Sequence, residues 1–149
     1  MDAPLPATRN TKHETRNIIE VAAGLIFRDG KLLITQRHAD AHLGGLWEFP
    51  GGKREPGETF EQCLRRELRE ELGCDVEVLE LIESITHDYP EKTVHLKFFR
   101  CRLVSGEPQP VDCAAVQWIS PAELDAHTFP AADEKIIKIL RDSETQWRY

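Results

Sequence analysis

The sequence predicts a layered α/β domain, in which strands of mixed direction are flanked by helices. Three observations support this prediction. Short apolar segments rich in β-branched residues alternate with turn signals, one long amphipathic helix interrupts them, and a second helical pattern lies near the end of the chain. The 149 residues match the length of one domain that can bury a continuous core.

The first elements expected are a flexible arm and a β-hairpin. Residues 1–17 are polar, contain prolines and lack periodicity, so we expect an arm there and a single domain over residues 18–149. Residues 18–27 and 31–37 are apolar and β-branched. Asp29-Gly30 between them is a strong signal for a two-residue hairpin turn.

Glycines mark the connection that follows. A loop over residues 38–46 contains Gly44-Gly45, and a short strand is expected at residues 47–49. Gly51 and Gly52 then indicate a turn that needs positive φ. A tight turn of this kind would also let backbone carbonyls approach a ligand.

A helix is predicted between Thr59 and Gly73. Thr59 and Gln62 fit a capping box, and Gly73 stands where a left-handed C-cap residue is expected. Apolar residues recur at every fourth position, at Phe60, Leu64, Leu68 and Leu72. This stripe predicts that one face of the helix packs on the core.

The rest of the chain predicts further strands and then two helices. The strands are expected at residues 75–87, 93–104 and 114–119. A turn at residues 88–92 and a proline-rich loop at residues 106–112 separate them. Ser120 caps a short helix with Pro121 at its first position. The final helix is expected at residues 131–141, and its buried face is formed by Ile136, Ile137 and Leu140.

Composition and charge exclude several classes of protein. The content of 40% hydrophobic and 30% charged residues is typical of a soluble globular protein. The net charge of −7 argues against long nucleic acids as ligands. No apolar run is long enough to span a membrane, and no signal peptide is apparent. The four cysteines form no close pair, which predicts reduced thiols in a cytoplasmic protein.

Three glutamates on the predicted helix indicate a metal site. Glu67, Glu70 and Glu71 stand at i, i+3 and i+4, so they project from one side of the helix and repel one another. Mg²⁺, with Mn²⁺ as a substitute, prefers oxygen ligands and commonly shares them with substrate phosphates. The cluster therefore predicts metal-assisted chemistry on a phosphate ester or anhydride. The alternative is a charged, solvated helix.

These residues resemble the signature of the Nudix hydrolases. The matching positions are Gly52, Glu58, Arg66-Glu67-Leu68, Glu70-Glu71, Gly73 and Cys74, of which only Cys74 departs mildly from the pattern. The similarity extends from about Ile18 to Leu140, and its segments resemble the MutT branch. That branch cleaves oxidised nucleoside triphosphates to monophosphate and pyrophosphate. The resemblance implies an α/β/α sandwich with a mixed sheet, in which the signature is a loop–helix–loop.

The resemblance also implies roles for individual residues around the metal. The implied metal ligands are Gly51, through its carbonyl, with Glu67, Glu70 and Glu71. Glu67 and Glu70 are also the implied catalytic acids. Arg66 would orient a catalytic glutamate, while Gly52 and Glu58 would support the site. Asp112 occupies an acidic position of the branch that is often Glu, so it is either a ligand or base, or equally a solvated loop residue.

A second set of residues matches the nucleotide pocket of the branch. Arg37 and Lys92 match positions that contact nucleotide or phosphate. Phe49 and Tyr89 would stack on a purine, and otherwise would belong to the core. Asp133 stands where the branch has Asn reading the base edge. An ionised Asp only accepts hydrogen bonds, whereas a protonated Asp would mimic Asn; the alternative for Asp133 is a helix cap.

The leading hypothesis is a Mg²⁺-dependent nucleoside triphosphate pyrophosphohydrolase of the cytoplasm, which removes oxidised nucleotides before DNA replication and so assists DNA repair. The expected substrate is 8-oxo-dGTP, followed by CTP or 5-hydroxy- or 5-methyl-dCTP. A non-catalytic Nudix nucleotide sensor is the alternative from another class. The recognition domain of an adenine-excising DNA repair enzyme is a third, but 149 residues leave no room for a glycosylase domain. We expect a monomer or weak homodimer that binds neither long nucleic acid nor membrane.

Overall fold

The computed structural model describes residues 17–143 and 147–148. The predicted arm therefore lies, apart from its last residue, outside the described residues. The elements in chain order are β1 (Asn17–Arg28), β2 (Lys31–Gln36), β3 (Trp47–Glu48), β4 (Gly51–Lys53), α2 (Phe60–Leu72), β5 (Asp75–Asp88), β6 (Lys92–Ser105), β7 (Ala115–Ile119), the 3₁₀ turns η1 (Pro121–Ala126) and η2 (Ala131–Asp133), and α3 (Glu134–Asp142).

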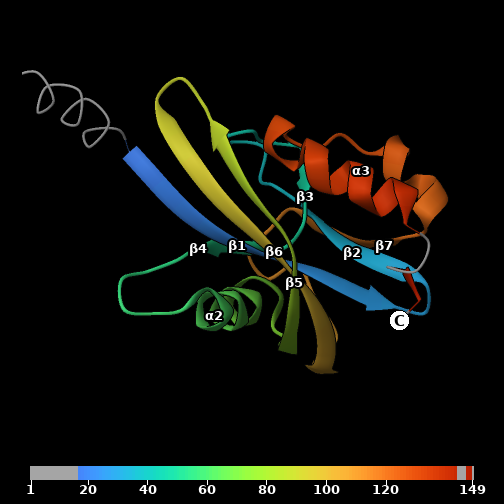
Figure 1. Cartoon of the computed structure of the whole chain (residues 1–149). Helices are drawn as coiled ribbons and strands as arrows, with labels where there is room; N and C mark the ends of the chain where they lie inside the picture. Colours follow the sequence, from blue (N-terminus) through green and yellow to red (C-terminus); the bar gives the residue numbers. More distant parts are fainter. Residues whose placement is uncertain (1–16, 144–146, 149) are drawn as a thin grey trace, which may run out of the picture.

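The strands form one mixed sheet between helices. The order is β3-β2-β1-β6-β5, with β4 paired to β1 and β7 paired to β2. The long β1–β6 pair is parallel and the remaining pairs are antiparallel. Helix α2 covers one face, while α3 lies with the 3₁₀ turns on the other (Figure 1). The predicted α/β/α sandwich is confirmed.

The hairpin and the helix caps form as their sequence signals predict. Asp29 and Gly30 have φ of 53° and 75°, which is the geometry of a two-residue turn between β1 and β2. In α2, Thr59 and Gln62 make both bonds of a capping box, and Gly73 closes the helix in the left-handed conformation. Local signals therefore fix both ends of the helix that carries the glutamates.

The core is divided between the two faces of the sheet. Leu64, Leu68 and Leu72 of α2 are fully buried in a cluster on one face, together with Ile26 and Phe99 of the sheet. The other cluster contains Leu25, Phe27, Phe98, Ile136, Leu140 and Trp147. Successive residues of β1 and β6 enter opposite clusters because side chains alternate across a strand. The sheet is thus buried from both sides around its middle.

Two predictions about backbone conformation are wrong. Gly51 and Gly52 belong to strand β4 and do not form a turn. Both positions are glycine for steric reasons, because a Cβ on Gly51 would lie 1.9 Å from the carbonyl oxygen of Ala22 in the neighbouring strand. The final helix also begins later than expected, since residues 131–133 form the 3₁₀ turn η2 and α3 starts at Glu134.

The cysteines and the helices were checked against two further expectations. All four cysteines are buried free thiols, as expected. None of the helices in the described part of the chain combines the length and apolar character needed to cross a membrane.

Candidate active site

A cavity of about 210 Å³ opens between the β1–β6 pair and the loops that precede β3 and η2. Its walls include all five predicted substrate residues, two of the predicted metal ligands and one supporting glycine, namely Arg37, Phe49, Tyr89, Lys92 and Asp133, then Gly51 and Glu71, and Gly52. The cavity therefore joins two regions that are far apart in sequence. Helix α2 contributes to one end, and η2 closes the other.

Arg66 organises the carboxylates of α2. Its guanidinium donates two hydrogen bonds to Glu58, at 3.0 Å from Nε and 2.6 Å from Nη2. Nη1 donates to Glu67 at 3.0 Å and to Glu70 at 3.3 Å, and Nη2 also donates to the carbonyl of Lys53. The Arg66 contacts lower the pKa of Glu58 to about 2. Planar guanidinium geometry suits this bidentate hold on a carboxylate.

Glu67 occupies space that Gly52 leaves open. A Cβ added to Gly52 would lie 2.2 Å from Cδ of Glu67, so no other residue fits there unless the carboxyl group moves. Burial raises the pKa of Glu67, although the bond from Arg66 opposes this effect. The glycine of β4 therefore sets the position of the Glu67 carboxyl group.

We expect Gly52→Ala to lower kcat about 10- to 100-fold, because even small displacements of a catalytic group reduce rates by such factors. The matched control is Gly57→Ala, since Gly57 has open space around its Cβ position. The alanine in this control is strained, because Gly57 has a φ of 89°. The control should therefore lower the unfolding temperature but leave kcat near the parent value. Equal turnover in Gly52→Ala and the parent protein would contradict the steric role of Gly52.

Glu71 is a buried acid with an unused oxygen. Its Oε1 is buried and has no hydrogen-bond partner among the described residues. Burial raises the pKa of Glu71 to about 8, with further increases from Glu48 and Glu67, while a hydrogen bond with the Gly51 backbone opposes the shift. A buried, unpartnered carboxylate oxygen beside another acid is the environment that a hard cation would neutralise.

The three glutamates of α2 do not form a ready-made metal cage. Within residues 17–143 and 147–148, no three His, Cys, Asp or Glu side chains converge in a metal-holding cluster. Glu67 and Glu70 contact Arg66 instead, and Glu70 is 60% exposed. The donor set is nevertheless entirely oxygen, which fits Mg²⁺ or Mn²⁺ better than softer metals.

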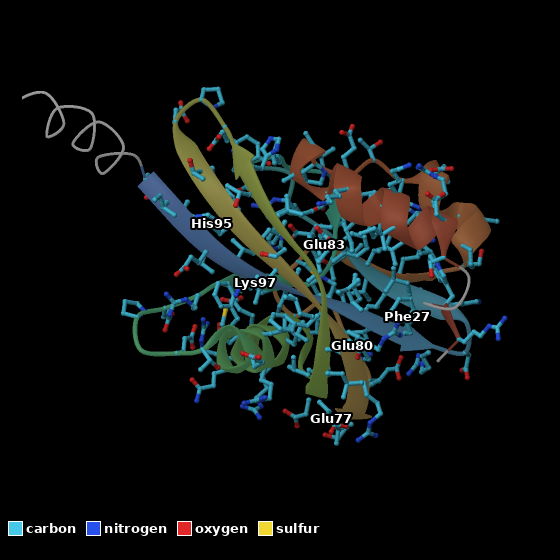
Figure 2. The ribbon with its side chains drawn as sticks, in the orientation of Figure 1. Phe27, Glu77, Glu80, Glu83, His95 and Lys97 are labelled. Atoms are coloured by element: carbon cyan, nitrogen blue, oxygen red, sulfur yellow. The ribbon has the colours of Figure 1, made fainter. Side chains whose placement is uncertain are left out.

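Acids elsewhere on the sheet are neutralised by basic partners. Figure 2 shows Glu77, Glu80 and Glu83 along β5. They pair with Arg102 at 2.7 Å, Arg100 at 3.2 Å and Lys135 at 2.8 Å, respectively. Glu71 differs from all of them, because its unpartnered oxygen is buried rather than paired.

Asp112 lies near α2 but is 79% exposed. Its backbone N–H donates to the carbonyl of Glu71 at 3.0 Å, which anchors the loop before β7 to the end of the helix. Its side chain lies 3.3 Å from Nε2 of His38, a contact that no local sequence pattern predicts. Asp112 thus lies beside the carboxylates and outside the lining of the cavity.

The far end of the cavity holds a second pair of acids. Asp133 is 5% exposed and stands at the N-cap position of α3, yet its side chain makes no capping bond. Burial raises its pKa to about 7, and Glu48 adds to the shift. Glu48 was not predicted as a site residue; its side chain pairs with Arg37 at 3.0 Å. The signal that could have identified it is an acid placed between two aromatic residues, Trp47 and Phe49, in a short strand.

The two aromatic residues of the pocket have different environments. Phe49 is 4% exposed and stacks on Phe129 with ring centroids 5.2 Å apart, so one of its faces is already covered. Tyr89 also lines the cavity and is half-buried, and its ring contacts His42, His87 and Nζ of Lys92. Of the two, Tyr89 is the less buried.

Comparisons with known proteins agree with this geometry. Residues 22–139 match the family described as NUDIX domain. The 8-oxo-dGTP diphosphatase of Escherichia coli strain K12 is 37% identical over 124 residues, which cover 83% of this chain and 96% of that protein. The CTP pyrophosphohydrolase of the same strain is 40% identical and covers 81% of this chain and 90% of its own. The solution structure of the E. coli ORF135 protein superimposes with a TM-score of 0.70 at 39% identity, covering 85% and 89% of the two chains.

Proposed function

The chain belongs to the Nudix family, and we propose that it is a nucleoside triphosphate pyrophosphohydrolase that releases pyrophosphate and a nucleoside monophosphate. The observation that carries the proposal is the cavity that joins Glu71 of α2 to Asp133 of η2. A triphosphate tail at one end and a base at the other account for both sets of acids. The relatives named for 8-oxo-dGTP and CTP hydrolysis support this substrate class.

The residues at the α2 end fit a divalent cation, for which we propose Mg²⁺ with Mn²⁺ as a substitute. Glu67, Glu70 and Glu71, together with the Gly51 carbonyl, would hold it. When bound, the cation neutralises phosphate charge and lowers the pKa of a water molecule.

The protein's own groups then position and deprotonate the nucleophile. The Arg66 guanidinium restrains Glu67 through a 3.0 Å hydrogen bond and is itself held by its hydrogen bond to Glu58. Glu67, whose pKa is raised by burial, is suited to accept a proton from water. Asp112 lies at the edge of the site, where we propose that it serves as a further ligand or as a base. Gly52 and Glu58 act by holding these groups in place.

At the other end we propose that Tyr89 stacks on the base and Asp133 reads its edge. Arg37 and Lys92 lie along the same wall and carry the positive charge that a phosphate or sugar oxygen would contact. Phe49 contributes apolar wall rather than a free stacking face. The first proposed substrate is 8-oxo-dGTP, followed by CTP and 5-substituted dCTP.

The wider setting follows from the same chemistry. We propose that residues 18–149 act as one catalytic domain, as a monomer or weak homodimer in the cytoplasm. The ligand is a free nucleotide, because the net charge of −7 repels a long phosphate backbone.

The test is pyrophosphate release from a panel of ordinary and oxidised triphosphates, with Mg²⁺ and with a chelator. Release that requires the cation, with at least one substrate strongly preferred, is the expected result. Tight nucleotide binding without release from any substrate would instead favour a nucleotide sensor. Release that is unaffected by the chelator would overturn the assignment of the glutamates.

A further inference from the structure

Two loops meet beside the C-terminal part of α2, and a histidine joins them. Strands β2 and β7 are antiparallel neighbours that pair Gln36 with Ala115 at this end. The chain leaves β2 where the loop before β7 arrives, and the N–H of Ala114 donates to the carbonyl of Gln36 at 2.9 Å. The side chains of His38 and Asp112 extend this contact, since Nε2 lies 3.3 Å from Oδ1. The register of the sheet therefore brings these two residues together.

The backbone is held in place on both sides of this contact. On one side, the N–H of Asp112 donates to the carbonyl of Glu71 at 3.0 Å. On the other side, the carbonyl of His38 accepts a hydrogen bond from the N–H of Ala41 at 3.1 Å. The loop folds back tightly here, because a Cβ on Gly44 would lie only 2.8 Å from the same carbonyl oxygen. The backbone thus fixes where both side chains start, and their torsions decide where the carboxyl group points.

The charge of Asp112 acts on the acids of α2. Burial is the main cause that raises the pKa of Glu71 to about 8, and the carboxylate of Asp112 is one of the charges that add to the shift. An exposed carboxyl group samples several rotamers unless a partner restrains it. Among the residues that the structure describes, His38 is the side chain that bonds to Asp112.

The chemistry of the pair fits a positioning contact better than a stabilising one. A carboxylate only accepts hydrogen bonds, so Nε2 of His38 carries the hydrogen. The side chains of His38 and Asp112 are 50% and 79% exposed, and exposed ion pairs contribute little to folding stability. The hydrogen bond occupies Oδ1 of Asp112 and leaves Oδ2 to contact a cation or a water molecule.

We propose that His38 is a positioning residue, which orients the carboxylate of Asp112 beside Glu71 through the hydrogen bond from Nε2 to Oδ1. This role rests on the proposed function, in which Asp112 is a further ligand or a base. Loss of an outer partner of this kind typically lowers metal affinity or activity by about 10- to 100-fold. For His38 we expect about tenfold, the lower end of that range, because solvent competes for both side chains.

The test is a double-mutant cycle of His38→Ala and Asp112→Ala. It is measured in kcat with Mg²⁺ and in the Kd for Mn²⁺ alone, which electron paramagnetic resonance reports without any turnover. Coupling in kcat alone identifies Asp112 as a base, and coupling in both quantities identifies it as a ligand. In either case His38→Ala should cost about tenfold in the parent and nothing further once Asp112 is alanine. Additive losses in both measurements would overturn the proposal.

The cycle also separates this role from an indirect effect through Arg37, the neighbour of His38 that lines the cavity. A displaced Arg37 would raise KM, and the effect would persist in the Asp112→Ala background. His38→Gln keeps an N–H donor and should recover part of the lost kcat or Mn²⁺ affinity. A loss in His38→Gln equal to that in His38→Ala would contradict the hydrogen bond as the cause.

His95→Ala is the matched control. His95, labelled in Figure 2, also bonds through a ring nitrogen to a neighbouring side chain, that of Thr86 at 2.8 Å, but it does not line the cavity. The control should change neither kcat nor the Kd for Mn²⁺ in either background. A loss in His95→Ala as large as that in His38→Ala would contradict a specific role for His38.

Failure of the proposed function would give a different result, namely no pyrophosphate release from any nucleotide by the parent protein. The Mn²⁺ cycle could still be measured in that case. Conversely, Asp112→Ala with parent-like kcat and Mn²⁺ affinity would leave His38 no group to act through. That result would overturn the role of His38 while pyrophosphate release remained intact.

Discussion

Glu67→Gln is expected to lower kcat for every triphosphate substrate by about 10³-fold or more. Removal of a general base alone typically reduces rates about 10²- to 10⁴-fold, and this change also removes a charged oxygen ligand. The fold should tolerate the substitution, because Gln keeps the shape that fits against Gly52 and can still accept the bond from Arg66. Steady-state pyrophosphate release and thermal unfolding measure the two effects separately.

The control for this prediction is Glu61→Gln. Glu61 lies on the same helix but is exposed, in its first turn, away from the acids near Gly52. The control should retain nearly full turnover, with at most a few tenths of a kcal/mol lost from the interaction with the helix dipole. Comparable turnover in Glu67→Gln and Glu61→Gln would show that Glu67 is not a catalytic group.

The parts of the fold that the sequence predicted well are those set by local interactions. The hairpin at Asp29-Gly30 and both ends of α2 depend on residues at most four positions apart, so their signals are complete within a short stretch. The positions of Glu67, Glu70 and Glu71 on one helix follow from the same periodicity. The loop–helix–loop could therefore be placed without knowledge of the rest of the molecule.

Other features depend on contacts between distant segments and could not be predicted in this way. Strand β4 exists because Gly51 and Gly52 pair with Ala22 and Ala23 of β1, a register that no local pattern specifies. Local composition alone suggested a turn. The pairing explains both glycines by close approach, to Ala22 in one case and to Glu67 in the other.

The carboxyl groups of the cavity show the same distinction. Asp133 was recognised only from the resemblance to a branch that has Asn there, and its burial comes from packing of η2 against the sheet. Glu48 gave no signal strong enough to act on, because a single acid in a two-residue strand is ordinarily solvated. Its significance appears only when β3 brings it beside Asp133 and Arg37.

Glu71→Gln is expected to abolish most turnover while raising the stability of the cation-free protein. The loss of kcat should again be about 10³-fold, since a charged ligand of the cation is removed. Stability should rise because a buried oxygen that has no partner among the described residues no longer has to carry charge. In a chelator at about pH 8, we expect a gain on the order of 1 to 2 kcal/mol, which corresponds to a rise of roughly 2 to 8 °C in Tm.

The sign of this effect depends on pH. The folded-state pKa of Glu71, about 8, lies above the ordinary value of 4.5. Folding therefore favours the protonated form, and the parent protein loses stability as pH rises from the ordinary value through the folded pKa. The gain in stability of Glu71→Gln should vanish near pH 4 and be largest near pH 8. The raised pKa of Asp133 also lowers the stability as pH rises, but this effect is the same in both proteins.

Added Mg²⁺ should reverse the ranking of the two proteins. A ligand that binds only the folded state stabilises it by an amount that grows with the logarithm of the ligand concentration over Kd, so Mg²⁺ should raise the Tm of the parent and have little effect on Glu71→Gln. Glu61→Gln should follow the parent in both conditions. A lower Tm for Glu71→Gln than for the parent in chelator at about pH 8 would mean that the buried carboxylate stabilises the fold by itself. That result would remove the reason for assigning the unpartnered oxygen of Glu71 to a cation.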